Sequence, residues 1–288
     1  MRIGINTRLN DSQGYSRYGE GLYEVLRGHG YSCTDFNLSD TDLDFYTLPQ
    51  AESDAKLCYE KELAKKAGIE IYQVHGPWRY PARDASEEDR QERLDSMKKS
   101  IRMTSVLGAR YWVVHPIMPV GVEDAGTGDA QRTWDINMEF MKELLVTAKK
   151  YGITICLENM PFLDFSMSKP GEILRFVQEI NDDNFKICLD TGHVSVFDGL
   201  SVGDVVRELG DEIKVFHIHD NKCNLDLHLM PYMGIIDWKD FGKALKEVRF
   251  DGVFSLETKA ASDLPDDLFE ETSKLLCRYA ERIVAETK

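Results

Sequence analysis

The sequence predicts an α/β protein in which eight parallel strands close into a (β/α)8 barrel (TIM barrel). Short runs rich in β-branched and aromatic residues alternate with amphipathic helical stretches along the whole chain. The strand-like runs recur at roughly the 36-residue length of one strand–helix unit. Because the chain carries no glycine-rich phosphate-binding turn, a closed barrel is favoured over an open, doubly wound sheet.

The predicted strands are short, and some of them are almost entirely apolar. Residues 153–158 and 185–190 have the near-continuous apolar character of parallel strands that are covered on both faces. Ser86 and Asp89 form the pattern of a capping box at a helix N-terminus. The eight predicted strands are residues 2–7, 32–38, 69–75, 110–115, 153–158, 185–190, 213–219 and 252–257.

The connections between the predicted elements differ in length at the two ends of the barrel. Segments that enter strands are short, whereas the segments 39–52, 116–131, 159–170 and 220–237, which leave strands, are long. Long loops at the C-terminal face are where barrels of this type carry their catalytic residues. Since no break in composition suggests a linker, we expect a single domain over residues 1–288.

The composition narrows the class of partner. A formal net charge of −15 disfavours binding to the negatively charged phosphate backbone of a nucleic acid, so nucleic acid is not the expected main partner. The first residues lack the basic and apolar regions of a signal peptide, and no apolar run reaches the roughly 20 residues of a membrane span. We therefore expect a soluble, cytoplasmic protein.

Imidazole and carboxylate side chains gather at the ends of six predicted strands. Carboxylates that converge without a cation would repel one another, and a divalent ion removes that repulsion. Mixed nitrogen and oxygen ligands suit Zn, Mn, Co or Fe, whereas an all-oxygen set suits Mg or Ca. The pattern predicts one or more divalent metal ions at the barrel mouth. The residues concerned are His75, His115, Glu158, Asp190, His193, His217, His219 and Glu257, with Asp226 and His228 in the loop after the seventh strand.

Two histidines of the seventh predicted strand compete for the ligand position. His217 and His219 are two residues apart, so both would point to the same side of a strand. His219 lies nearer the C-terminal end and is the predicted ligand, with His217 predicted to support it or to lie in the barrel interior. Trp78, in the loop after the third strand, would either line the substrate pocket or fill the rim of the barrel.

At these residues the sequence resembles the xylose-isomerase-like barrel superfamily, which joins sugar isomerases and epimerases to the type IV apurinic endonucleases. The resemblance covers essentially the whole chain. Its most specific stretches are LENMP (157–161), LDTGH (189–193), the segment 217–238 and SLET (255–258).

The resemblance to the ketose epimerases implies one divalent ion, usually Mn, Co or Mg, and an enediolate reaction. Glu158 and Glu257 would be the acid/base pair on opposite faces of the substrate, and His193 would contact a substrate oxygen. The epimerases have an arginine where Leu225 stands, and Lys222 is the expected substitute. The implied metal ligands are Glu158, Asp190, His219 and Glu257.

The resemblance to the endonucleases implies a larger set around three zinc ions. Its additional ligands match His75, His115, His193, Asp226 and His228. We expect a metal-dependent isomerase or epimerase of a small sugar or sugar-derived substrate. A dehydratase or lyase acting on an inosose- or shikimate-like substrate, a zinc phosphodiesterase and a non-enzymatic sugar-binding role remain alternatives. Barrels of this group often pair, so a homo-oligomer is also expected.

Overall fold

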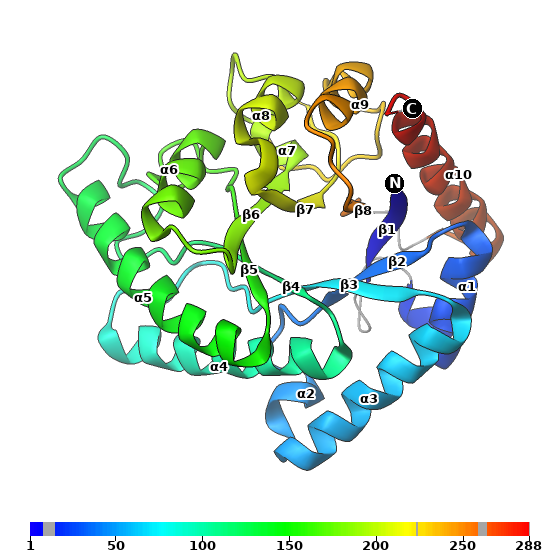
Figure 1. Ribbon diagram of the computed structural model, residues 1–288, viewed down its shortest axis with the longest axis horizontal. Helices are drawn as coiled ribbons and strands as arrows, with labels where there is room; N and C mark the ends of the chain where they lie inside the picture. The colour runs from blue at the N-terminus through cyan, green and yellow to red at the C-terminus, as the bar shows by residue number, and fades with distance from the viewer. Residues whose placement is uncertain (8–14, 223, 259–263, 288) are drawn as a thin grey trace.

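The eight predicted strands form one parallel sheet that closes into a barrel (Figure 1). The structure is a computed structural model that describes residues 1–7, 15–222, 224–258 and 264–287. Each observed strand lies within the range predicted for it. The strands are β1 (Arg2–Thr7), β2 (Cys33–Asn37), β3 (Glu70–His75), β4 (Tyr111–Val114), β5 (Thr154–Glu158), β6 (Phe185–Asp190), β7 (Ile213–His217) and β8 (Val253–Leu256).

The barrel closes between β7 and β8. The sheet order runs from β7 through β6, β5, β4, β3, β2 and β1 to β8. Just beyond β7, the amide of Ile218 donates to the carbonyl of Ser255 at 2.9 Å, and the amide of Glu257 donates to the carbonyl of Ile218 at 3.0 Å. These bonds bring the end of β7 beside the end of β8, which confirms the predicted fold class.

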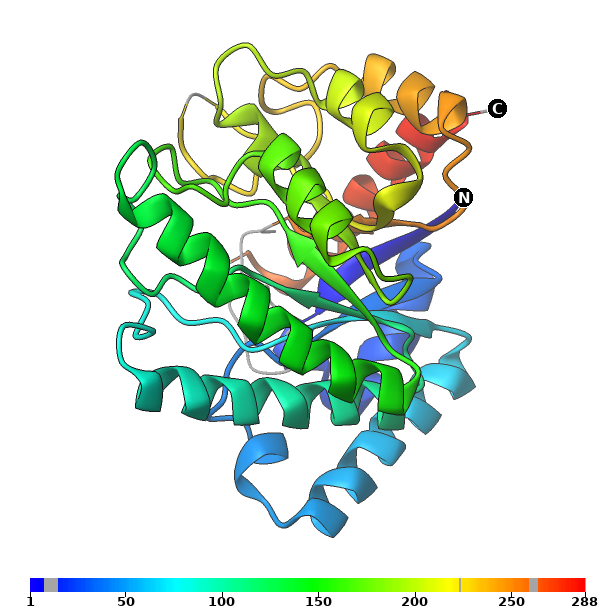
Figure 2. The same cartoon turned by 60° about the vertical axis from the view of Figure 1, so that its left-hand side comes forward.

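The helices form an outer layer around the strands, as Figures 1 and 2 show. The N-cap Ser86 accepts from the Asp89 amide at 3.0 Å at the start of α4, as the capping pattern predicted. The helices are α1 (Leu22–His29), α2 (Asp44–Thr47), α3 (Gln50–Ala67), α4 (Glu87–Leu107), α5 (Asp129–Tyr151), α6 (Pro170–Ile180), α7 (Thr191–Ser195), α8 (Val202–Leu209), α9 (Trp238–Glu247) and α10 (Asp266–Ala285), with 3-10 turns at Tyr15–Gly21 and Gly210–Glu212.

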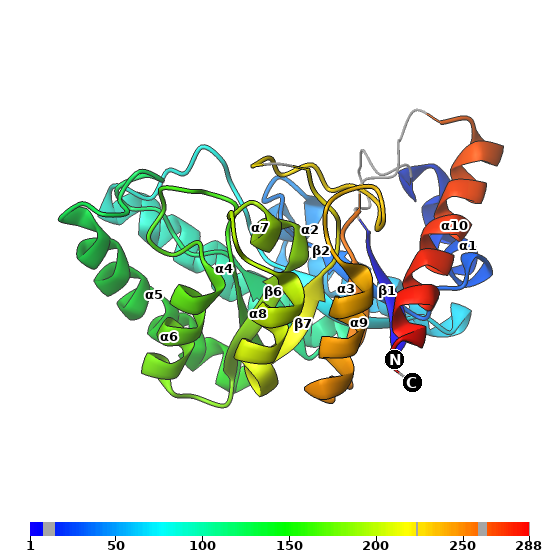
Figure 3. The same ribbon diagram turned by 90° about the horizontal axis from the view of Figure 1, so that it is seen from above.

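The two ends of the barrel differ as expected. In Figure 3 both chain termini lie at the lower edge, while the segment between β7 and α9 lies at the upper edge. The segment predicted as the loop 39–52 contains the short helix α2 and the start of α3. Within the described residues, no helix is both long enough and apolar enough to cross a membrane.

The inside of the barrel is layered. Val113, Cys156, Cys188 and Val215 form a small buried cluster of their own, separate from the main core between strands and helices. Alternate residues of a strand point to the same face, so the residue two positions further lies in the next layer towards the mouth. This relation joins Cys156 to Glu158, Cys188 to Asp190 and Val215 to His217 within their strands, while His115 and Glu257 directly follow the ends of β4 and β8.

Candidate metal centre

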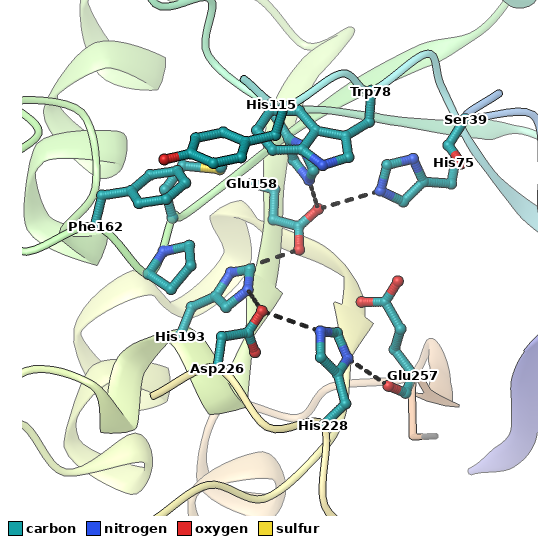
Figure 4. A pocket seen from close by; sticks show the side chains of 13 residues that line it. Ser39, His75, Trp78, His115, Glu158, Phe162, His193, Asp226, His228 and Glu257 are labelled. Carbon is teal, nitrogen blue, oxygen red and sulfur yellow. Dashed lines mark hydrogen bonds and ion pairs between the residues drawn. The ribbon is translucent and has the colours of Figure 1, made fainter. Parts of the chain in front are cut away.

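A cavity of about 420 Å³ opens at the C-terminal ends of the strands. Figure 4 shows Glu158 near its middle, with His115 and His75 on one side and His193, Asp226 and His228 on another. Its described lining is Ser39, His75, Trp78, Tyr80, His115, Glu158, Met160, Pro161, Phe162, His193, Asp226, His228 and Glu257.

Four donors from four strands meet at the base of this cavity. Glu158, Asp190, His217 and Glu257 each offer one ligand atom within 4.8 Å of the others. The Nδ1 atom of His217 lies 2.8 Å from Oε1 of Glu158 and 3.1 Å from Oε2 of Glu257. Three carboxylates and one imidazole in this group form a mixed nitrogen and oxygen set that fits a divalent ion.

The structure differs here from the prediction, which gave this position to His219. β7 ends at His217, and its register pairs His217 directly with Asp190. His217 is therefore level with the last residue of β6, while His219 lies beyond the strand, where the alternation no longer determines direction. His219 still contacts Asp190, with Nε2 3.0 Å from Oδ2, but its ring stacks on His228 at 4.1 Å.

Two further groups of donors lie beside the first. His75, His115 and Glu158 form one, with His115 Nε2 2.9 Å and His75 Nε2 3.9 Å from Oε2 of Glu158. The other contains the remaining predicted residues of the larger set together with His219. Its members are His193, His219, Asp226 and His228.

Backbone carbonyls fix the rings of three of these histidines. The Nδ1–H group of His75 donates to Gly76 O at 2.8 Å, that of His193 to Asn159 O at 2.7 Å, and that of His228 to Glu257 O at 2.8 Å. Because a carbonyl can only accept, Nε2 of each ring is left to face the carboxylates. Metal-binding histidines are oriented in this way.

The electrostatics of the centre also fit a cation. Burial alone would raise the pKa of Glu158, but His217 and His115 hold it well below its ordinary value. Burial would lower the pKa of His193, yet Asp190 and Asp226 raise it to about 10. The buried carboxylates thus depend on positive charge, and a divalent ion supplies that charge while its imidazole ligands stay neutral. Nε2 of His115 contacts Glu158, whereas its Nδ1 atom is buried and has no hydrogen-bond partner among the described residues.

The sequence around the ligands holds them in place. A Cβ atom at Gly192 would collide with the imidazole of His219, so this position needs glycine. The fully buried Asp220 accepts from the amides of Gly234 and Ile236 at 2.9 and 3.2 Å, and so folds back the loop that carries Asp226 and His228. Sequence reasoning did not single out Asp220.

Aromatic rings line the opposite side of the cavity. The rings of Trp78 and Tyr80 are stacked with centroids 6.3 Å apart, and those of Tyr80 and Phe162 with centroids 5.5 Å apart. Trp78 also packs its ring against the edge of His115 at 4.2 Å, so it both lines the cavity and supports a candidate ligand. We call Trp78, Tyr80 and Phe162 the aromatic wall. Sequence reasoning found only its first member.

The predicted substrate contact Lys222 lies elsewhere. It is exposed and is not among the described residues that line the cavity. Leu225, where the epimerases were expected to have arginine, is 59% exposed. Counted from His217 instead of His219, the same offset of six residues falls on Cys223, which lies outside the described residues.

Fold and site together define a (β/α)8 barrel with clustered imidazole and carboxylate donors at its C-terminal face. Residues 24–279 match the family model of the xylose isomerase-like TIM barrel, and the chain belongs to this family.

Relatives in the family carry different names. An uncharacterized protein of Methanocaldococcus jannaschii is 30% identical over 71% of this chain and 70% of its own. A D-psicose 3-epimerase of Ruminiclostridium cellulolyticum is 25% identical over 71% of this chain and 69% of its own. A probable endonuclease 4 of Mycoplasmopsis agalactiae is 25% identical over 72% and 74%.

Solved structures share the whole architecture. A D-tagatose 3-epimerase-like protein superposes with a TM-score of 0.76 at 26% identity, covering 100% of both chains. The IOLI protein, crystallised with a zinc atom, superposes with a TM-score of 0.73 at 21% identity, covering 100% of this chain and 98% of its own.

Proposed function

We propose that this protein is a divalent-metal-dependent isomerase or epimerase of a small sugar or sugar-derived substrate. The observation that carries the proposal is the convergence of Glu158 and Glu257 on Nδ1 of His217 at the base of the cavity. The proposed ligands are Glu158, Asp190, His217 and Glu257, with Mn, Co, Mg or Zn as the ion.

The two glutamates are the proposed proton carriers. Both line the cavity, so each carboxylate can reach a bound substrate. A divalent ion in this set would polarise a carbonyl and its neighbouring hydroxyl and so acidify the intervening C–H bond. One glutamate, as the carboxylate, would then remove this proton, and the other, as the carboxylic acid, would return a proton to the opposite face and so invert the carbon. Return of the proton to the neighbouring carbon would instead move the carbonyl group. His193, in the same lining, is the proposed contact for a substrate oxygen.

The aromatic wall supports a sugar-like substrate. Sugars and cyclitols expose C–H groups on one face and hydroxyls at their edges. A face of Trp78 or Tyr80 can pack on the C–H groups while the polar residues opposite bind the oxygens. The epimerase names of several relatives support the same substrate class.

Metal content and isotope exchange test the proposal together. Protein purified without chelator is expected to carry about one equivalent of divalent metal per chain, measured by elemental analysis. Incubated in D2O with a panel of ketoses and inososes, it is expected to incorporate deuterium at one sugar carbon, detected by NMR. A metal-loaded protein that neither exchanges nor converts any member would contradict the proposal. A new ultraviolet-absorbing enone would indicate dehydration instead.

A second candidate function is phosphodiester hydrolysis at a multinuclear zinc site. It is favoured by the two additional donor groups that flank Glu158, because they provide ligands for more than one ion. Two or three equivalents of zinc, together with cleavage of an oligonucleotide that contains an abasic site, would support it. A single bound equivalent and an intact oligonucleotide would exclude it.

A further inference from the structure

A fully buried carboxylate lies behind the metal centre and is not used in the proposed reaction. Asp35 of β2 is 0% exposed, and its Oδ2 atom lies 3.0 Å from Nε2 of His217. The opposite ring nitrogen, Nδ1, faces Glu158 and Glu257. The imidazole of His217 therefore lies between Asp35 and the proposed metal position.

The strands hold Asp35 in this position from both sides. Asn6 of β1 and Gln73 of β3 are its direct neighbours in the register of the sheet. A shift in the β2–β3 register between Thr34 and Asp35 brings Gln73 opposite Asp35. Asn6 and Gln73 donate amide hydrogens to the same Oδ2 atom at 3.1 and 3.2 Å.

The direction of these hydrogen bonds identifies Oδ2 as an acceptor. The amide nitrogen of Gln73 also donates to the carbonyl oxygen of Phe216 at 3.3 Å, and that oxygen can only accept, so the Gln73 side chain cannot be reversed. Three donors then converge on Oδ2 of Asp35, and Nε2 of His217 is the third. His217 consequently holds a hydrogen on Nε2, which leaves the lone pair of Nδ1 for a metal ion.

We infer that Asp35 is the positioning residue of the metal centre: it fixes the tautomer and the ring orientation of His217 and strengthens this ring as a ligand. The inference rests on the metal centre proposed above. Backbone carbonyls fix the rings of His75, His193 and His228 in the opposite tautomer, with hydrogen on Nδ1. At His217 a carboxylate replaces the carbonyl, and its negative charge increases the basicity of the ligand nitrogen.

The test is the affinity of the whole chain for Co²⁺, measured by competition with a chelator and by the visible absorption of bound cobalt. Asp35→Asn keeps the volume and removes the charge. Its dissociation constant is expected to rise by about 10- to 100-fold, and the cobalt spectrum is expected to change. Thermal unfolding of the metal-free variant checks that it folds.

The matched control is Asp124→Asn. Asp124 is also buried, at 2% exposed, and accepts from the amide and hydroxyl of Ser166 at 2.8 and 2.9 Å, outside the cavity. It is expected to leave the affinity and the cobalt spectrum unchanged. An Asp35→Asn protein that binds Co²⁺ within twofold of the wild type overturns the inference but not the metal centre. A wild-type protein that binds no divalent metal overturns both.

A measurement on the unmodified chain decides the inference if the variant does not fold. In the Zn²⁺-loaded wild type, ¹⁵N NMR of the imidazoles is expected to show His217 with hydrogen on Nε2 and metal on Nδ1. Comparison of the metal-free spectra of the wild type and of His217→Gln identifies the signal, which is then followed as Zn²⁺ is added to the wild type. Hydrogen on Nδ1 with a free Nε2 would overturn the inference.

Discussion

Glu158 and His217 are the last residues of β5 and β7, and Oε1 of Glu158 lies 2.8 Å from Nδ1 of His217. Neither strand is next to the other in the sheet, since β6 lies between them. The contact therefore passes over the end of β6. Glu158 reaches His115 with its other oxygen at 2.9 Å, so one carboxylate joins the donor group of His217 to that of His75 and His115.

This central position predicts that the two glutamates are indispensable. Glu158→Gln and Glu257→Gln should each reduce kcat by about 10²- to 10⁴-fold, because an amide cannot carry the proton. Turnover of the substrate found in the sugar panel measures this loss, and metal content should be determined beside it, since both residues are also proposed ligands. Glu60→Gln is the control, because Glu60 accepts from Tyr23 at 2.9 Å outside the cavity. Substantial activity in either test variant removes that residue from the acid/base role.

The two histidines after Val215 are predicted to have separate effects on metal binding. His217→Gln should empty the central set, because it removes the donor that contacts both glutamates. His219→Gln should leave that ion bound and weaken binding at the group of His193, Asp226 and His228. Titration with Co²⁺ followed by elemental analysis distinguishes the two. Equal losses of the same equivalent would show that the histidines share one ion.

His217 and His219 also show which features of the site could be predicted from the sequence. The alternation that places apolar Cys156 two residues before Glu158, and Cys188 two before Asp190, is readable from the chain alone. Applied to β7, it joins Val215 to His217 and favours that histidine. What the sequence could not reveal is where β7 ends, because an apolar residue, Ile218, continues the pattern past His217, the last residue of the strand.

The support of the site was harder still to predict. Asp35 acts in the middle of a strand, with no neighbouring motif to mark it, and its contacts come from β1, β3 and β7. The aromatic wall joins Trp78 and Tyr80 to Phe162, which lies after a different strand. Both depend on which strands the closed barrel brings together, and a pattern read along one segment contains no such information.

The number of bound ions is predicted to depend on His75. In a site with several metals, His75→Ala should remove about one equivalent per chain, because His75 belongs to the group with His115 and Glu158. In a site with a single metal, the content should not change. His29→Gln is the control: His29 is a buried histidine that contacts Ser273 at 2.9 Å, away from the cavity. Elemental analysis of both variants, prepared in parallel, gives the answer.

The aromatic wall is predicted to act on substrate binding. Trp78→Ala should raise KM by roughly 2- to 10-fold, as expected for the loss of about 0.5–1.5 kcal/mol of ring stacking, with a smaller change in kcat. Tyr59→Ala, at a ring on α3 that is 50% exposed and outside the cavity, should have no effect. Steady-state kinetics on the best substrate test this. A fall in kcat at constant KM would indicate that Trp78 acts through His115, whose ring it contacts.

Asp84 is predicted to control the stability of the loops that shape the cavity. It is 1% exposed, pairs with the buried Arg93 of α4 and accepts from the amide of Met118 at 3.0 Å, so it ties the loop after β3 to the loop after β4. Burial would raise the pKa of Asp84, but Arg93, the amide of Met118 and Arg79 together outweigh burial and hold the pKa below its ordinary value. The pair then stabilises the fold fully above the unfolded-state pKa of about 4, and this contribution is lost as the pH falls through the lower folded-state value.

Asp84→Asn should therefore lower the free energy of unfolding by about 3 kcal/mol at pH 7, and by less at pH 3, as measured by urea denaturation. The exposed Asp95→Asn should change it little at either pH, and a loss at Asp84 that is equal at both pH values would show that the Arg93 pair is not its cause.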